Sequence, residues 1–226
     1  MLKPIALIPA RAGSKRVPRK NFLEVDGKLM LERTIEIVQQ SGIFQEILIS
    51  SDDEQAEEIA KKNKIKYRFR NPDLSSDASS VDQVCLDVIE NDKSIELLCC
   101  IYATAVLLKP ITIRESYELL VSDAIESLMG ASKYNYSPVE AFEVLQDGRI
   151  RPLLPDWRGK KSQTFPQTCV SNGTFYWATA RHLREHGSLI STETKPFYVP
   201  SNQVCDVNTP EDLVELLTIM NRKNEE

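Results

Sequence analysis

Short apolar runs alternate along the chain with segments in which hydrophobic residues recur every three or four positions. The apolar runs predict buried β-strands at residues 5–8, 47–49, 67–69, 95–102, 127–132 and 170–178. The helical spacing predicts amphipathic helices at about 29–41, at about 54–63, from 81 onward, at about 112–121 and from 210 onward. Strands that alternate with helices at this spacing predict a three-layer α/β/α fold around a mostly parallel sheet.

Capping residues mark several of the predicted helix ends. Gly42 follows the first helix at the position that favours a left-handed cap. Ser80 and Gln83 have the spacing of a capping box. Thr112 is expected to cap the following helix, and the pair Thr209–Pro210 is expected to begin the last one.

The pattern changes between residues 133 and 166. Weak alternation near 142–145 is interrupted there by two tyrosines and four prolines: Tyr134, Tyr136, Pro138, Pro152, Pro155 and Pro166. We expect a single domain over residues 1–226, in which this segment is an excursion from the main sheet.

Composition and charge exclude several classes of protein. Of the 226 residues, 42% are hydrophobic and 27% charged, unlike collagen-like or disordered chains. The net charge of −5 gives no overall attraction for nucleic acid or anionic membranes. The longest apolar run is far shorter than the about 20 residues that span a bilayer. The first basic cluster follows an apolar run, the reverse of a secretory signal. We expect a cytoplasmic protein without nucleic-acid or membrane partners.

The five cysteines and two histidines do not form a metal or disulfide motif. An odd number of cysteines without a C-x-x-C pair favours neither a zinc site nor a disulfide framework. Cys99 and Cys100 fall within the most apolar predicted strand, so we expect them to be small core residues.

A dense basic loop follows the first predicted strand. Residues 11–20 include five cations and no acid: Arg11, Lys15, Arg16, Arg19 and Lys20. Ligands of open α/β sheets bind beyond the carboxyl ends of the strands, where successive backbone N–H groups can bind phosphate. The spacing matches neither a P-loop nor G-x-G-x-x-G. A phosphate-binding loop and a solvated basic loop or nucleic-acid patch therefore both remain open.

The segment 5–21, I-A-L-I-P-A-R-A-G-S-K-R-V-P-R-K-N, resembles the nucleotide-binding loop of the acylneuraminate cytidylyltransferases, also called CMP-nonulosonic acid synthetases. Segments similar to four further family landmarks follow in order at 49–54, 70–77, 171–176 and 206–213. Within the family, residues 100–105 and 175–177 most resemble the pseudaminic acid branch.

The resemblance implies a Rossmann-like nucleotidyltransferase that transfers CMP from CTP to the anomeric hydroxyl of a nine-carbon acid sugar and releases pyrophosphate. It implies catalytic roles for Arg11 and Lys20 in neutralising phosphate charge. The nucleotide-binding positions that it implies are Ala10, Gly13, Ser14, Asn21, Arg70, Asp77 and Ser80.

The resemblance also implies sugar, metal and subunit contacts. The positions that match or lie near sugar-binding positions are Tyr102, Thr104, Lys161, Gln163 and Asn172. Mg²⁺ would be held by Asp206 and Asn208, where the family usually carries two carboxylates. Lys161 stands where an arginine is common. The excursion resembles the family's dimerisation arm, which implies a homodimer.

Several of these residues have a structural interpretation as well. Arg70 can form a surface ion pair with Asp73, and Ser80 can be only a helix cap. Asn172–Gly173 can be a turn or bulge that needs a positive φ. The acids at 52–53 are expected to lie in the first turn of a helix.

Two other functions stay open. One is a Kdo cytidylyltransferase or a purine-using sugar nucleotidyltransferase of the same fold. The other is a catalytically weakened paralogue that binds nucleotide, which Lys161, Asn208 and Val106 favour because each departs from the family's usual residue.

Overall fold

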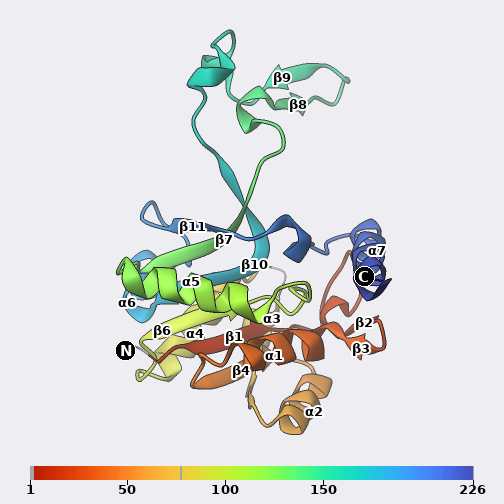
Figure 1. Ribbon diagram of the computed structural model, residues 1–226, viewed down its shortest axis with the longest axis vertical. Coiled ribbons are helices and arrows are strands. Elements are labelled where there is room, and N and C mark those ends of the chain that lie inside the picture. Colours follow the sequence, from red (N-terminus) through yellow and green to blue (C-terminus); the bar gives the residue numbers. More distant parts are fainter. Residues whose placement is uncertain (1–2, 77, 226) are drawn as a thin grey trace.

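The computed structural model describes residues 3–76 and 78–225. A seven-stranded sheet forms the centre of the molecule, in the order β11-β7-β10-β6-β1-β4-β5 (Figure 1). Its strands are β1 (Ile5–Pro9), β4 (Glu46–Ser51), β5 (Lys66–Phe69), β6 (Leu97–Ile101), β7 (Ser127–Lys133), β10 (Cys169–Thr179) and β11 (Lys195–Tyr198). Strand β10 runs antiparallel to both neighbours, and the other pairs are parallel. The predicted mostly parallel sheet is confirmed.

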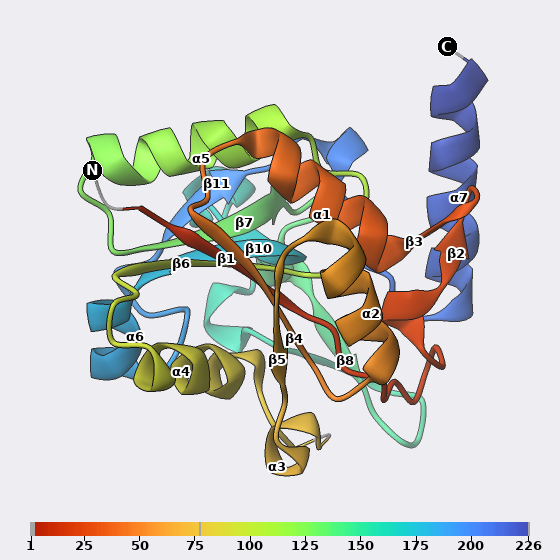
Figure 2. The same ribbon diagram turned by 90° about the horizontal axis from the view of Figure 1, so that it is seen from below.

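Helices cover both faces of this sheet (Figure 2). They are α1 (Met30–Ser41), α2 (Glu54–Asn63) and α5 (Pro110–Ser122) on one face, and α4 (Val81–Asn91) and α6 (Ala180–His186) on the other. The short helix α3 (Pro72–Ser75) precedes α4 in the chain, and α7 (Pro210–Glu225) packs at one end of the molecule in a separate cluster that includes Met30. Residues of β1 alternate between two cores. Ile8 packs in the core that includes residues of α1, α2 and α5, whereas Leu7 packs in the core that includes residues of α4 and α6. The three-layer prediction is therefore confirmed, and Cys99 and Cys100 are fully buried on β6 as expected.

Most predicted caps are present. Gly42 ends α1 with a φ of 69°, and Ser80 and Gln83 form a complete capping box on α4. The Thr209 hydroxyl accepts a hydrogen bond from the backbone of Asp212 at the start of α7. The prediction for Thr112 is wrong, because α5 begins two residues earlier, at a proline whose fixed φ suits the first helical position. The buried Thr112 hydroxyl instead donates to Gln203.

Short elements complete the fold. β2 (Glu24–Val25) pairs with β3 (Lys28–Leu29), and the 3₁₀ helices outside the excursion are η1 (Lys20–Phe22) and η5 (Ser201–Gln203). Sequence reasoning did not predict β2, β3, β11 or α6. No helix within residues 3–76 and 78–225 is long and apolar enough to cross a membrane.

The segment between β7 and β10 projects away from the sheet as an arm (Figure 1). It contains η2 (Pro138–Glu140), β8 (Phe142–Val144), β9 (Ile150–Pro152), η3 (Pro155–Trp157) and η4 (Ser162–Thr164), and β8 and β9 form an antiparallel hairpin. Within the arm, the Trp157 ring meets Phe165 edge to face and lies under the Lys160 ammonium group. The arm thus has small contacts of its own and no share of the two cores beside the main sheet.

Candidate active site

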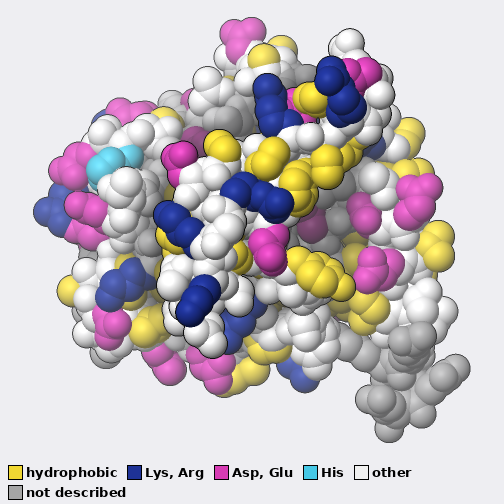
Figure 3. All heavy atoms as spheres, turned by 90° about the horizontal axis from the view of Figure 1, so that it is seen from above, with side chains coloured by type: hydrophobic (Ala, Val, Ile, Leu, Met, Phe, Trp, Pro, Cys, Tyr) yellow, Lys and Arg dark blue, Asp and Glu magenta, His cyan; other side chains and the backbone are white. Residues whose placement is uncertain are grey.

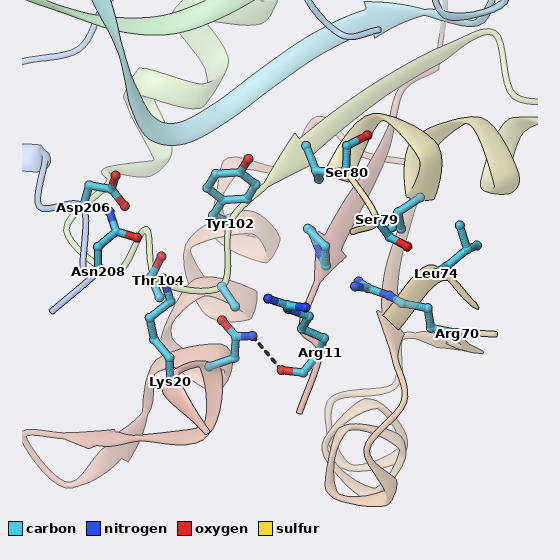
Figure 4. Close-up of a pocket in the computed structure, with 15 residues that line it drawn as sticks. Arg11, Lys20, Arg70, Leu74, Ser79, Ser80, Tyr102, Thr104, Asp206 and Asn208 are labelled. Atoms are coloured by element: carbon cyan, nitrogen blue, oxygen red, sulfur yellow. Dashed lines mark hydrogen bonds between the residues drawn. The ribbon is translucent and has the colours of Figure 1, made fainter. Parts of the chain in front are cut away.

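A cavity of about 290 Å³ opens beyond the carboxyl ends of β1 and β6 (Figure 4). The polar residues that line it are Arg11, Lys20, Asn21, Arg70, Ser79, Ser80, Tyr102, Thr104, Asp206 and Asn208. A second cavity, of about 440 Å³, is lined entirely by residues 11–21 and shares Arg11, Lys20 and Asn21 with the first. The concave side of the basic loop is therefore adjacent to the main cavity.

Neighbouring strands and helices hold the basic loop in place. The Ser51 hydroxyl donates to the Ala10 carbonyl, and the Asp52 carboxylate accepts a hydrogen bond from Ala12 N at 2.8 Å. Asn21 Nδ2 donates to the Arg11 carbonyl at 3.0 Å (Figure 4). Asp52 thus anchors the loop, and the adjacent Asp53 is the N-cap of α2. The prediction that both acids lie in the first turn of the helix is wrong, because α2 begins at Glu54.

Four of the five loop cations line the second cavity: Arg11, Lys15, Arg16 and Lys20. Arg11 Nη1 donates to the carbonyls of Ser75 and Ser76 and lines both cavities. Arg19 instead lies beside α2, where it pairs with Asp53 at 2.8 Å. Because four of the five cations line one concave surface, most of the positive charge of the loop is concentrated there.

Lys20 connects the loop to the segment that precedes α7. Its half-buried ammonium group donates to the Val207 carbonyl at 2.6 Å. Burial lowers the pKa of Lys20, Asp206 raises it, and Arg16 and Arg11 lower it. The low pKa reflects a position in which positive charge is crowded and poorly hydrated, so a bound polyanion would be favoured there.

Arg70 is a buried wall residue, not a surface residue. Its side chain donates from Nη2 to the Ser50 carbonyl at 2.8 Å and from Nε to the Ser50 hydroxyl at 3.2 Å. The residue is only 5% exposed, and burial lowers its pKa. The alternative of a surface ion pair with Asp73 is therefore wrong, because the side chain turns inward to β4.

Tyr102 lines the cavity and packs against Tyr176 of β10. The rings of Tyr102 and Tyr176 meet edge to face with centroids 5.8 Å apart. The Tyr176 hydroxyl contacts that of Ser171. Burial raises the pKa of both phenols, so they stay neutral and act as hydrogen-bonding groups.

The acidic loop, residues 204–209, precedes α7 and places Asp206 in the wall of the cavity. Asn208 Oδ1 accepts a hydrogen bond from Arg16 Nη2 at 3.0 Å. The Asp212 carboxylate accepts two more, from the backbone N–H groups of Asn208 and Thr209, and these bonds lower its pKa. Within the described part of the chain, no three His, Cys, Asp or Glu side chains form a group that could hold a metal.

The structure brings most of the predicted site residues together. Nine of them line the main cavity: Arg11, Lys20, Asn21, Arg70, Ser80, Tyr102, Thr104, Asp206 and Asn208. Gly13 and Ser14 line the loop cavity, and Ala10 is buried at the end of β1. Asp77 lies outside the described residues.

Three predicted sugar contacts lie elsewhere. Lys161 and Gln163 are exposed on the arm and do not line the cavity of their own chain. Asn172 is buried in β10, where its polar atoms bond to Thr174 and Ser132. Their sugar-binding roles stay predictions.

Some residues of the site were not predicted. Leu74, Val81 and Val84 form an apolar wall of the cavity. Sequence reasoning missed this role because apolar residues at such spacing are also typical of a helix face that packs in a core. Asp212 holds the backbone of the acidic loop, and the T-x-x-D spacing from Thr209 was a usable signal for it.

Comparison with known proteins agrees with this geometry. A family model described as cytidylyltransferase matches residues 5–132. The chain belongs to the cytidylyltransferase family. This cytidylyltransferase is 33% identical to the pseudaminic acid cytidylyltransferase of Campylobacter jejuni subsp. jejuni serotype O:2, over 100% of this chain and 99% of that protein. It is 29% identical to the CMP-N,N'-diacetyllegionaminic acid synthase of Legionella pneumophila, over 98% of this chain and 99% of that protein.

Solved structures share the fold. A CMP:2-keto-3-deoxy-manno-octonic acid synthetase complexed with CTP aligns with a TM-score of 0.73 at 18% identity, and the match covers 98% of this chain and 99% of that one. A 4-diphosphocytidyl-2C-methyl-D-erythritol synthase from Anaerococcus prevotii aligns with a TM-score of 0.67 at 13% identity, covering 97% and 99%. These cytidylyltransferases therefore have the same three-layer architecture.

Proposed function

We propose that this enzyme transfers CMP from CTP to the anomeric hydroxyl of a nonulosonic acid, and that pseudaminic acid or a close relative is the acceptor. Similarity to pseudaminic acid cytidylyltransferases along the whole chain supports this acceptor class. The observation that carries the reaction is that Arg11 and Lys20 line both cavities, which are therefore adjacent. A triphosphate along the loop would place its α-phosphate next to the main cavity.

In the proposed reaction, the anomeric oxygen forms a bond to the α-phosphorus while the bond from that phosphorus to the bridging oxygen breaks. Pyrophosphate leaves, and the hydroxyl proton passes to water. Such transfers depend chiefly on positioning and charge neutralisation. Arg11 and Lys20 would neutralise the phosphates, and the neutral phenol of Tyr102 would bind a sugar hydroxyl.

The donors near the acidic loop fit a magnesium ion. Mg²⁺ is often held by one or two carboxylates together with substrate phosphates and water, so Asp206 can serve as the protein carboxylate. Asn208 offers a neutral oxygen nearby, although Arg16 already donates to it. When bound, the ion would supply positive charge to the phosphates.

The direct test is pyrophosphate release from CTP in the presence of single acid sugars. Turnover with pseudaminic acid, and less or none with Kdo, is the expected result. Turnover with Kdo alone would overturn the proposed acceptor. CTP that raises the melting temperature without turnover of any sugar would instead identify a nucleotide-binding paralogue.

We further propose that the arm pairs two copies of the chain. Figure 3 views the molecule from the side of the arm, where apolar and basic side chains lie next to one another. Exposed apolar residues of the arm include Tyr136, Val144, Ile150 and Leu153, at 87%, 74%, 60% and 57%. A second copy would cover such a surface. Lys161 would then reach the partner's cavity.

Mixing two inactive variants tests this arrangement. Lys161→Ala and Lys20→Ala homodimers each lack one group at every site. If Lys161 acts across the dimer, subunit exchange should restore about one quarter of the wild-type rate, because half of the dimers then contain one complete site. No recovery after exchange, or a monomer by light scattering, would contradict the proposal.

A further inference from the structure

Strand β10 is irregular next to the cavity. Its register against β7 shifts between Ser171 and Tyr176. Gly173 lies inside this interval with a φ of +65°, a backbone conformation that favours glycine. Bulges of this kind often lie beside active sites, where they redirect neighbouring groups.

The bulge brings the backbone of Gly173 against the acidic side of the cavity. A Cβ atom at Gly173 would lie 2.9 Å from Asp206 Cγ and 3.0 Å from Asp206 Oδ1. Real Cβ atoms do not approach other atoms so closely. The Asp206 carboxylate therefore occupies space that any other residue at position 173 would fill.

Buried hydrogen bonds fix the shape of the bulge. Thr174 Oγ1 donates to Asn172 Oδ1 at 2.6 Å, and Asn172 Nδ2 donates to Ser132 Oγ at 3.3 Å. Gly130 on β7 leaves room for this pair, since a Cβ there would lie 2.5 Å from Thr174 Oγ1. Both polar atoms of the Asn172 side chain therefore form hydrogen bonds that stabilise the bulge.

The same bulge also positions Tyr102, which lines the cavity. The backbone N–H of Tyr102 donates to the Thr174 carbonyl at 3.0 Å. The placement of Tyr102 and that of Asp206 therefore depend on one local backbone conformation.

We propose that Gly173 is a positioning residue for the Asp206 carboxylate, and that the Asn172–Thr174 hydrogen bond maintains the bulge that makes this possible. The inference rests on the proposed function, because it takes Asp206 to be the carboxylate that binds the divalent cation together with CTP. It gives Asn172 and Gly173 a role in cation binding, through the shape of β10.

The test compares Gly173→Ala with Gly187→Ala. Gly187 has the same φ of +65°, but nothing lies within 4 Å of its Cβ position. Both variants replace a glycine at the same positive φ, and only the first crowds Asp206. Binding of Mn²⁺ in the presence of CTP, followed by electron paramagnetic resonance, reports on the cation without turnover. Asp206→Asn supplies the reference for a lost ligand.

Gly173→Ala is expected to weaken Mn²⁺ binding on the order of 10- to 100-fold, as the loss of outer contacts does at other metal sites. Gly187→Ala should bind Mn²⁺ like the wild type. Thr174→Val, which removes the bond to Asn172 without adding bulk, should weaken binding in the same direction. This variant gives a second measurement if Gly173→Ala does not fold.

The outcomes separate the inference from the proposed function. If Asp206→Asn weakens Mn²⁺ binding while Gly173→Ala and Thr174→Val do not, the positioning role is wrong and the metal role stands. If Asp206→Asn binds Mn²⁺ like the wild type, both the metal role and the positioning role are overturned. Equal weakening by Gly187→Ala would also overturn the inference, because strain alone would then explain the loss.

Discussion

Replacement of Lys20 by methionine separates the ammonium charge from the apolar stem of this side chain. In the structure, the ammonium group donates to the Val207 carbonyl at 2.6 Å and lies where the two cavities meet. Methionine keeps a similar length and removes only the charge and its hydrogen-bond donors. If Lys20 stabilises charge that develops on the phosphates, the variant loses a transition-state interaction that lysine alone provides.

The expected loss of rate is large. Removal of one such donor in other enzymes costs about 2.7–4 kcal/mol, which corresponds to a decrease in kcat on the order of 10²–10³. The expected change in stability is small. Loss of the hydrogen bond from a charged donor costs about 1.5–3 kcal/mol of stability. Removal of the ammonium group also removes the cost of burying its charge, which offsets much of this loss. We therefore expect the melting temperature to change by no more than about 2–4 °C.

The assay is initial pyrophosphate release at saturating CTP and sugar, together with a thermal melt of each variant. Arg19→Met is the matched control, because Arg19 belongs to the same loop but pairs with Asp53 beside α2. It should retain nearly the wild-type rate. A rate for Lys20→Met within about threefold of wild type would show that Lys20 does not stabilise the transition state, since such a donor is worth far more. An equal loss in Arg19→Met would show that total loop charge, not position, is what matters.

Two further predictions concern the acidic loop and α6. Asn208→Asp should lower the Mg²⁺ concentration needed for half-maximal rate, because it restores a charged oxygen ligand; an unchanged titration would argue against a ligand role. His182 is buried, its Nε2 has no hydrogen-bond partner among the described residues, and burial lowers its pKa below 6.5. The unfolded chain then binds this proton more readily, so the stability that neutral His182 contributes is complete above pH 6.5 and declines below it. His182→Leu should make the free energy of unfolding, measured with urea, depend less on pH between pH 7 and 5. An unchanged pH dependence would contradict this assignment.

Much of the site was accessible from the sequence because its signals are local. The concentration of cations at 11–20 directly after an apolar run indicated an anion site, and the carboxyl end of β1 is where the loop indeed lies. The family landmarks identified nine residues that line one cavity. Arg70 shows the limit of this reasoning, since its sequence neighbours permitted a surface ion pair and only its burial against Ser50 excluded it.

Side-chain spacing within a few residues was enough to predict six strands of the main sheet, the helices α1, α2, α4, α5 and α7, and the basic loop. The antiparallel direction of β10 and the place of β11 beside β7 became known only from the folded structure. It alone placed Asp206 against Gly173, 33 positions earlier in the chain. The physical reason is that pairing between distant segments and close backbone approach depend on how the whole core packs, and no local pattern records them.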